Sequence, residues 1–549
     1  MENALNRYNH WLKNVKIYDD LNLLKVMSEN EIIDSFYKEL SFGTGGIRGK
    51  MGLGTAKIND YVVSRVTRGI VLYVSKSKIN NNKIVIGYDT RNNSKHYAEL
   101  VAEILSYYKF NVFIFNDSLP TPCVSFAVRK LQAFLGIVIT ASHNPAEYNG
   151  YKLYYRHGCQ ITENIAKKIY DEIKSLDYFT NETIQINKSY IHKISENVYE
   201  DYISSVLKQN VQNVNFKNVS IVYTPLNGTG LKPVMDILHK CGFNNIILVK
   251  EQAEPNGNFP TCKKPNPEEK EALELAIQYA NETKSDLVLA TDPDCDRLSI
   301  AIRVGSNFKI LSANELGCLL LDYICKYSKL PENPVFYKTI VTTDLAELIA
   351  KSYNVKTINT LTGFKYIGEQ INKLEFSNKE DCFVFGFEES CGFLKGTYVR
   401  DKDATVASLI VCEMYSFYSS NGITLTNKLD ELYKKFGYCL NFQLSYKFEG
   451  LEGQKSMLNI MDYVRYQLQK IEQFKVILKK DYLKGIEGLP KSDVIKIYLN
   501  NNSSIIFRPS GTEPKLKIYF SIFSKDSCSS NDIANNIKKG IERFIDKYL

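Results

Sequence analysis

A serine at the end of an apolar run is the first candidate for chemistry. Residues 134–145, FLGIVITASHNP, are typical of a buried strand through Thr140, followed by a loop that contains Ser142. Open α/β sheets present reactive groups at the carboxyl ends of strands. A serine hydroxyl is a weak nucleophile at neutral pH, so Ser142 needs a base, a cation or an attached phosphoryl group. The alternative is a serine that only forms a turn.

The residues around Ser142 favour a chemical role. His143 and Asn144 follow the hydroxyl directly, and Pro145 fixes the turn. Lys152, in YNGYKLYY, comes after one short loop. The segment predicts a serine surrounded by hydrogen-bond donors.

Three aspartates follow a second strand-like run, residues 287–290. They are Asp292, Asp294 and Asp296. In an extended loop, alternate carboxylates point to one side, where they repel unless a hard cation such as Mg²⁺ neutralises them. An EF-hand would need glycine at Arg297 and glutamate at Arg303, and the aspartyl-phosphatase pattern would need Thr or Val at Asp296. We favour a metal site, with serine as the nucleophile, over a solvated acidic turn.

Two further segments could bind an anion. The first is RPSGTEP, with the donors Arg508, Ser510, Gly511 and Thr512. The second is the glycine-rich GTGGIRGK, which matches neither a dinucleotide fingerprint nor a P-loop but offers backbone amides and Arg48. A nucleophile, a cation site and an anion site in one chain indicate phosphoryl transfer.

The segment GFEES could read a sugar. Glu388 and Ser390 supply a carboxylate and a hydroxyl that suit adjacent sugar hydroxyls, although a solvated turn is an equal alternative. Lys365 and Lys402 stand near predicted strand ends and, taken alone, would be surface lysines.

Composition narrows the class of protein. The 549 residues carry a net charge of +8 without a basic block, so nucleic acid is not expected as a partner. Twelve cysteines form no CxxC pair, which favours reduced thiols in a cytoplasmic protein. We find no secretory signal and no apolar run long enough for a membrane span, so no membrane is expected either.

Short β-rich runs alternate with helical text along most of the chain, which predicts an α/β fold with a structural repeat. We expect an N-terminal helical segment (1–40), three α/β domains (41–210, 211–314 and 315–424) and a smaller α+β domain (425–549). The closing helix is expected to begin beside Asp532 and to place Ile533, Ile537, Ile541 and Phe544 on one face.

Taken together, TGGIRG, TASHNP, DPDCDR, GFEES and RPSGTEP resemble the motifs of the α-D-phosphohexomutase family in order and spacing, and are similar to its phosphoglucomutase branch. The resemblance covers nearly the whole chain. It implies three related mixed-sheet α/β domains plus a smaller C-terminal α+β domain around a central cleft.

The resemblance also implies roles for these residues. Ser142 would be the phosphorylated serine and, with the three aspartates, would hold one Mg²⁺ per active site. Arg48, His143, Lys152 and Lys365 would support proton transfer around it. Substrate binding would fall to Asn144, Arg297, Glu388, Ser390, Lys402, Arg508, Ser510, Gly511 and Thr512.

The implied reaction interconverts glucose 1-phosphate and glucose 6-phosphate through a phosphoserine and a 1,6-bisphosphate, with glucose 1,6-bisphosphate as activator. Mannose and pentose phosphates are alternative substrates, because GFEESCGF lacks the histidine of dual mannose and glucose enzymes and has Phe393 instead. A phosphatase or a non-catalytic sugar-phosphate-binding paralogue is a more remote alternative. The sequence does not decide between monomer and dimer.

Overall fold

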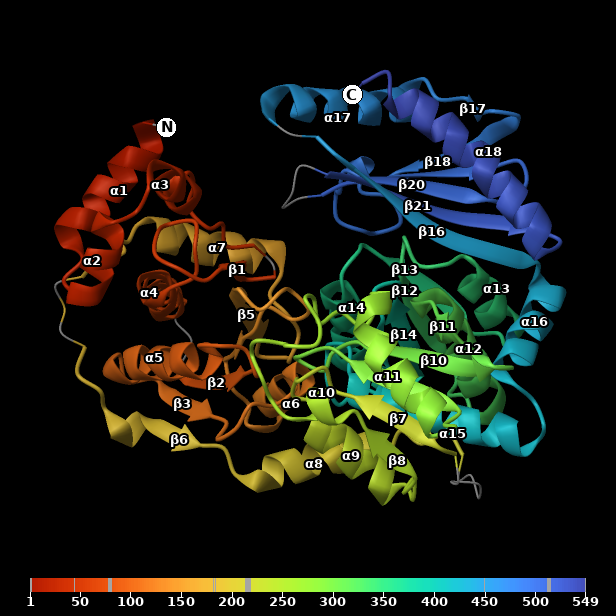
Figure 1. The fold of residues 1–549 in the computed structure, drawn as a ribbon, viewed down its shortest axis with the longest axis horizontal. Coiled ribbons are helices and arrows are strands. Elements are labelled where there is room, and N and C mark those ends of the chain that lie inside the picture. The colour runs from red at the N-terminus through yellow and green to blue at the C-terminus, as the bar shows by residue number, and fades with distance from the viewer. Residues whose placement is uncertain are drawn as a thin grey trace. The chain divides into compact units, whose positions relative to one another are not determined.

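The structure, a computed structural model, describes residues 2–43, 45–77, 81–180, 182, 184–212, 219–448, 450–510 and 515–548. The chain forms two compact units, each described here by itself. The first unit holds Met1–Leu311, Ile367–Phe383 and Ser390–Phe417, and the second holds Ser312–Tyr366, Val384–Glu389 and Tyr418–Leu549. Figure 1 follows the chain from the red N-terminus to the blue C-terminus.

The first unit begins with three short helices. They are α1 (Glu2–Asn14), α2 (Tyr18–Lys25) and α3 (Glu29–Phe36), and α1 packs against the other two (Figure 1). A capping box between Ser28 and Glu31 starts α3. Trp11 and Phe36 are fully buried in the same core as the first sheet, so these helices are part of the first domain's packing.

The first sheet has six strands in the order β1-β5-β4-β2-β3-β6. Its strands are β1 (Ile47–Lys50), β2 (Lys83–Tyr88), β3 (Asn111–Ile114), β4 (Leu135–Ile139), β5 (Tyr148–Tyr155) and β6 (Ile191–Lys193). The helices here are α4 (Asp60–Lys76), α5 (Ser94–Tyr107), α6 (Thr121–Lys130), α7 (Glu163–Lys174) and α8 (Glu196–Leu207), with a 3₁₀ turn, η1 (Lys188–Tyr190). Strand β2 is parallel to β3 and β4, whereas β5 is antiparallel to β4, so the sheet is mixed.

The second sheet, also in the first unit, has the order β11-β10-β9-β7-β8. Its strands are β7 (Ile221–Thr224), β8 (Ile246–Leu248), β9 (Leu287–Thr291), β10 (Leu298–Val304) and β11 (Asn307–Leu311). Helices α9 (Leu231–Lys240), α10 (Lys250–Ala253) and α11 (Lys270–Glu282) connect them. Strand β7 is parallel to β8 and β9, and β10 is antiparallel to β9, as in the first sheet.

The third sheet repeats this plan. Its strands are β12 (Val335–Thr339), β13 (Lys356–Thr360), β14 (Phe383–Glu388) and β15 (Gly392–Leu394). Its helices are α12 (Ala313–Tyr327), α13 (Leu345–Ser352), α14 (Phe364–Phe376), α15 (Ala404–Ser420) and α16 (Leu425–Phe436), with a 3₁₀ turn, η2 (Glu380–Cys382). The order β13-β12-β14 matches β3-β2-β4 and β8-β7-β9. The serine and aspartate segments therefore come at the ends of β4 and β9, and GFEES spans the end of the equivalent strand, β14.

The C-terminal domain, in the second unit, is an antiparallel sheet with the order β16-β21-β20-β19-β18-β17. Its elements are β16 (Tyr438–Lys447), α17 (Gly450–Tyr466), β17 (Lys470–Ile471), β18 (Phe474–Asp481), η3 (Tyr482–Lys484), β19 (Ile495–Leu499), β20 (Ser504–Pro509), β21 (Lys515–Ser524) and α18 (Ser527–Ile545). The expected start of α18 beside Asp532 is wrong. The helix begins one and a half turns earlier, because the Asp526 side chain accepts the Ser529 N–H and caps it.

The predicted fold class, three mixed-sheet α/β domains followed by a smaller α+β domain, is confirmed. Among the described residues, no helix is long and apolar enough to cross a membrane. All twelve cysteines lie in the described part of the chain, and no disulfide joins any of them.

Candidate active site

Ser142 lies in a strained turn just beyond β4. Its φ of 52° is in the left-handed region, which is uncommon for a residue other than glycine. The Ser142 N–H donates to Thr140 Oγ1 at 2.8 Å, and the side chain is buried. Strain of this kind persists where the surroundings hold it, and it often marks a functional site.

Sequence analysis missed the residue that holds this turn, Arg91. Its guanidinium, fully buried, donates to the backbone carbonyls of Ser142, Asn144, Pro145 and Tyr148. Asp89 Oδ2 lies 3.3 Å from Arg91 Nε, and its carboxylate also accepts from the hydroxyls of Ser94 and Thr140. Both residues follow β2, which pairs with β4, so the adjacency of parallel strand ends was the available signal.

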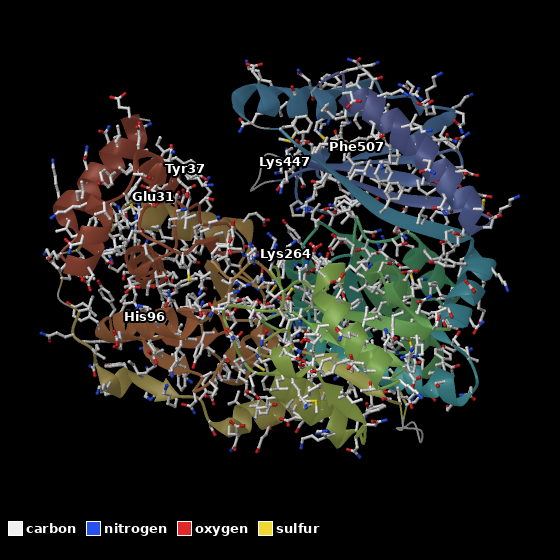
Figure 2. All side chains as sticks on the ribbon, in the orientation of Figure 1. Glu31, Tyr37, His96, Lys264, Lys447 and Phe507 are labelled. Atoms are coloured by element: carbon white, nitrogen blue, oxygen red, sulfur yellow. The ribbon has the colours of Figure 1, made fainter. Side chains whose placement is uncertain are left out.

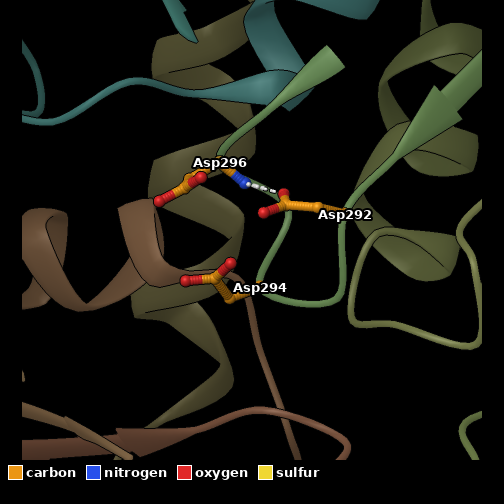
Figure 3. Close-up of side chains that lie close together, drawn as sticks. All are labelled: Asp292, Asp294 and Asp296. Atoms are coloured by element: carbon orange, nitrogen blue, oxygen red, sulfur yellow. Dashed lines mark hydrogen bonds between the residues drawn. The ribbon is translucent and has the colours of Figure 1, made fainter. Parts of the chain in front are cut away.

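The three aspartates converge in the loop between β9 and β10 (Figure 3). One carboxylate oxygen from each of them lies within 4.8 Å of the others, and all three are buried. The Asp296 N–H donates to Asp292 Oδ1 at 3.0 Å, as the dashed line in Figure 3 shows. The expected extended loop is wrong, because residues 293–295 turn and Cys295 has a φ of 51°. The turn, rather than strand alternation, brings the carboxylates together.

Two buried lysines face these aspartates. Lys152 Nζ lies 2.7 Å from Asp294 and 3.5 Å from Asp296, and Lys402 Nζ lies 3.0 Å from Asp296. Lys402 is 8% exposed, so the alternative of a surface lysine is wrong for it. Thr121, also unpredicted, donates from its hydroxyl to Asp294 at 2.8 Å.

The carboxylates titrate differently because of these neighbours. Burial, with repulsion from Asp296 and Asp294, raises the pKa of Asp292 well above its ordinary value. Burial alone would raise the pKa of Asp294 as well, but the ammonium group of Lys152 outweighs it and lowers that pKa. A cation bound near Asp292 would offset the repulsion from Asp296 and Asp294 that adds to the effect of burial on its pKa.

The residues fit a hard divalent cation. Asp294 Oδ1 is buried and accepts no hydrogen bond from any described residue. Ser142 Oγ donates to Asp292 Oδ2 at 2.9 Å, so the serine oxygen stands beside the carboxylate cluster. Three carboxylates with an adjacent hydroxyl or phosphate oxygen form the oxygen donor set that Mg²⁺ prefers. In the described part of the chain, no other group of acidic, histidine or cysteine side chains clusters in this way.

His143, Asn144 and Arg48 gather around the serine. His143 Nδ1 lies 3.2 Å from Ser142 Oγ. Arg48 Nη1 donates a hydrogen bond of 2.8 Å to Asn144 Oδ1. Burial lowers the pKa of His143 well below its ordinary value, and the positive charges of Arg297 and Arg48 lower it further. The imidazole is therefore neutral at pH 7.

Arg297 is oriented by a residue that sequence analysis missed. Glu268 Oε1 accepts from Arg297 Nη1, while Arg297 Nε stays 4.0 Å from Asp292 and 3.9 Å from Asp296. Ser390, another predicted residue, also belongs to the first unit and is half-buried.

The remaining predicted residues belong to the second unit. Glu388 is buried at the end of β14, and Lys365, in the first turn of α14, places its ammonium 4.5 Å from the ring centre of Tyr366. Glu389, which follows Glu388, accepts from the hydroxyls of Thr339 and Thr342, at 2.9 and 3.2 Å.

Arg508 lies near the end of strand β20, and Ser510 follows that strand directly. Arg508 Nη1 donates to Tyr519 Oη at 3.2 Å, and the Ser510 N–H donates to the Lys515 carbonyl at 2.8 Å. Arg508 stands directly opposite Lys517 in the sheet, a pairing of like charges that a bound anion would stabilise. Gly511 and Thr512 lie outside the described residues.

Three family models match the chain in sequence order. They are described as phosphoglucomutase/phosphomannomutase, alpha/beta/alpha domain I, domain II and domain III, and they match residues 39–180, 198–305 and 312–436. A phosphoglucomutase of Staphylococcus haemolyticus is 36% identical over 504 residues, which are 89% of this chain and 91% of that protein. One from Staphylococcus aureus is 34% identical over 544 residues, covering 96% and 97%.

Solved structures show the same fold at low identity. The open form of parafusin, a phosphoglucomutase from Paramecium, gives a TM-score of 0.71 at 19% identity and covers 93% of this chain and 96% of its own. An Aspergillus fumigatus N-acetylphosphoglucosamine mutase, in complex with GlcNAc-6P and magnesium, gives 0.51 at 13% identity and covers 92% and 96%. With the family models and the relatives above, they place the chain among the mutases, a class of isomerases: it belongs to the α-D-phosphohexomutase family and resembles phosphoglucomutase.

Proposed function

We propose that this enzyme interconverts glucose 1-phosphate and glucose 6-phosphate by way of a phosphorylated Ser142 and glucose 1,6-bisphosphate. The observation that supports this most directly is the 2.9 Å contact of Ser142 Oγ with Asp292 in a buried acidic cluster. A nucleophile beside a cation site is what phosphoryl transfer requires. Glucose is favoured because the relatives of about 35% identity are named phosphoglucomutase, with mannose and pentose phosphates as alternatives.

The proposed reaction conserves one phosphoryl group on the enzyme. The bond from phosphorus to Ser142 Oγ breaks as a new bond forms to O6 of glucose 1-phosphate; the proton of that hydroxyl passes to a base, and Ser142 Oγ takes up a proton. The bisphosphate then turns over. Ser142 Oγ takes the phosphoryl group from O1 and gives up its proton, O1 takes up a proton, and glucose 6-phosphate leaves.

The base that accepts the O6 proton is proposed to be one of the residues assigned to proton transfer from the sequence. His143 is close enough for the task, because its Nδ1 lies 3.2 Å from Ser142 Oγ, and its lowered pKa keeps the imidazole neutral before the transfer. Lys152 and Lys365 are the proposed acids or bases elsewhere, and Arg48 would stabilise the transferring phosphoryl group.

Asp292, Asp294, Asp296 and an oxygen at Ser142 would hold one Mg²⁺, which when bound neutralises negative charge on the transferring group. The magnesium in the Aspergillus enzyme's structure is consistent with that assignment. With Mg²⁺ bound, Lys402 and Arg297, which flank the aspartates, would be partly freed from these carboxylates and would contact substrate oxygens.

For the other end of the substrate we propose Arg508, Ser510, Gly511 and Thr512 as the site of the phosphate that is not transferred. It must accept a phosphate on either carbon, and charge recognition by a guanidinium and backbone amides tolerates that better than hydroxyl recognition does. Glu388, Ser390 and Asn144 are proposed to contact the sugar. We also propose the domain boundaries given by the sequence (41–210, 211–314, 315–424 and 425–549) and a cytoplasmic location.

The test is a conversion assay with Mg²⁺, a trace of glucose 1,6-bisphosphate and, separately, glucose, mannose and ribose 1-phosphates. Fastest conversion of glucose 1-phosphate supports the proposal, and a different preferred sugar would replace the substrate while keeping the mechanism. Ser142→Ala should abolish conversion, whereas the exposed control Ser175→Ala should retain it. Full activity in Ser142→Ala, or release of inorganic phosphate in place of isomer, would overturn the mutase proposal.

A further inference from the structure

Four consecutive charged residues of the first unit are buried. They are Arg400, Asp401, Lys402 and Asp403. Lys264 of the same unit, labelled in Figure 2, has the ordinary arrangement of a charged side chain, because it is exposed. Burying a charge costs free energy unless the charge is paired and hydrogen-bonded. The partners of these four side chains therefore decide how the segment is held.

The two ends of the segment are held by residues outside the proposed active site. Arg400 Nη2 pairs with Glu375 Oε2 at 2.7 Å. The Asp403 carboxylate accepts from the Tyr202 hydroxyl at 3.0 Å. The backbone between these two contacts has little freedom, so the directions of the two central side chains are set locally.

Asp401, the first of the two central residues, is held from β5 and from the turn that follows it. Its Oδ2 accepts from Tyr154 Oη at 2.7 Å and from Gln160 Nε2 at 3.1 Å. Burial, with the negative charge of Asp401, raises the pKa of Tyr154 well above its ordinary value, so the hydroxyl keeps the proton that it donates. Tyr154 stands two residues after Lys152, so the two side chains lie on the same face of β5.

The other carboxylate oxygen of Asp401 is directed toward Lys402. Oδ1 accepts from the Lys402 backbone N–H at 2.9 Å and lies 3.6 Å from Lys402 Nζ. The same Nζ lies 3.0 Å from Asp296 Oδ2. The ammonium group is therefore between two buried carboxylates and nearer to Asp296. Donation from Tyr154 and Gln160 draws the negative charge of Asp401 toward its far oxygen, which weakens its attraction for Lys402.

We propose that Tyr154 and Asp401 are positioning residues that hold the ammonium group of Lys402 beside Asp296, within reach of substrate oxygens. The inference rests on the proposed function only for the role of Lys402 toward the substrate. Without the Tyr154 hydroxyl, Asp401 attracts Lys402 more strongly and the ammonium group moves away from Asp296. A displacement of about 1 Å in an active site can lower the rate by about a hundredfold.

A double-mutant cycle on kcat tests whether Tyr154 acts through Lys402. Lys402→Met removes the ammonium group, and Tyr154→Phe removes only the hydroxyl. We expect Tyr154→Phe to lower kcat for glucose 1-phosphate by about ten- to a hundredfold, and to have no further effect in Lys402→Met. The control Tyr155→Phe removes a hydroxyl from the opposite face of β5 and should keep the wild-type kcat. An equal loss from Tyr154→Phe in both backgrounds would refute the inference.

Mn²⁺ affinity, measured by electron paramagnetic resonance, gives a second readout that needs no turnover. Lys402→Met should tighten Mn²⁺ binding by about tenfold or more, because a positive charge beside Asp296 is removed. Tyr154→Phe should tighten it less, and should add nothing in Lys402→Met. If Tyr154→Phe does not fold, Gln160→Met removes the other donor to the same oxygen of Asp401 and should act in the same direction.

The two readouts separate this inference from the proposed function. Full turnover in Lys402→Met, with the expected coupling in Mn²⁺ affinity, would show that Lys402 has no role toward the substrate and would support its positioning by Tyr154. Wild-type Mn²⁺ affinity in Tyr154→Phe, or an additive effect of the two substitutions on that affinity, would overturn the positioning role.

Discussion

Replacing Arg91 by methionine should loosen the serine loop selectively. The Arg91 and Asp89 side chains are both fully buried, and the guanidinium is the partner of four loop carbonyls as well as of Asp89. Methionine fills much of the same space but supplies no donor. The variant therefore leaves a buried carboxylate and several buried carbonyls without their cation.

The expected loss is large for a local change. Removing one partner of a buried ion pair costs about 3 to 5 kcal/mol, because the other charge stays buried and unpaired. The lost carbonyl bonds belong to the same network, so their cost does not simply add. At about 1.4 kcal/mol per factor of ten, amide exchange through local opening of residues 140–148 should become roughly a hundredfold to a few thousandfold faster.

Hydrogen exchange followed by mass spectrometry measures this directly. Arg156→Met, which removes an exposed arginine from the same unit, is the control and should leave the loop's exchange unchanged. Adding Asp89→Asn to Arg91→Met should restore part of the protection, since the uncompensated charge is gone. If Arg91→Met exchanges like the wild type in residues 140–148, the loop is held by packing and by the Ser142–Thr140 hydrogen bond, and the role given to Arg91 is wrong.

Three further outcomes are expected. Asp294→Ala should abolish both Mg²⁺-dependent turnover and the binding of Mn²⁺, measured by electron paramagnetic resonance, while the circular dichroism spectrum stays unchanged. Persistent Mn²⁺ binding would contradict the metal assignment. Gly228→Ala should weaken the same metal binding, because a Cβ there would lie 2.4 Å from Pro293 Cα in the aspartate loop, whereas Gly45→Ala, with open space around it, should not. Burial lowers the pKa of Lys395 to about 8, so competitive acetylation should show a midpoint near that value, and its contribution to stability should rise as the pH increases from about 8 toward 10.5. A midpoint near 10.5 would show that Lys395 is solvated.

The sequence predicted the sheets well because their strands are short apolar runs that end in polar loops. The runs ending before Ser142 and Asp292 became β4 and β9 within a residue or two of the predicted ends. The position of α18 was missed because Asp526 and Asp532 are both good cap residues, and only the hydrogen bond to Ser529 distinguishes them.

The candidate site was predictable only where its residues are close in sequence. Arg91 stands 51 positions from Ser142, and nothing in its own segment identifies its targets as backbone carbonyls. Knowing that β2 lies beside β4 would have found it, but strand order is a property of the folded chain. Taken alone, the segment of Lys402 indicated a surface lysine for the same reason, since the negative charge beside it comes from Asp296, more than a hundred residues away.

The equivalent positions of the loops after β4, β9 and β14 have an evolutionary consequence. Three copies of one domain would begin with identical loops at the same edge of their sheets, and each loop could then specialise without disturbing the ladder of hydrogen bonds behind it. One copy came to contain the serine, another the acidic cluster and the third the GFEES segment. If Ser142 is the nucleophile and GFEES contacts the sugar, as proposed, substitutions in the third loop can change sugar preference while the nucleophile stays intact in the first.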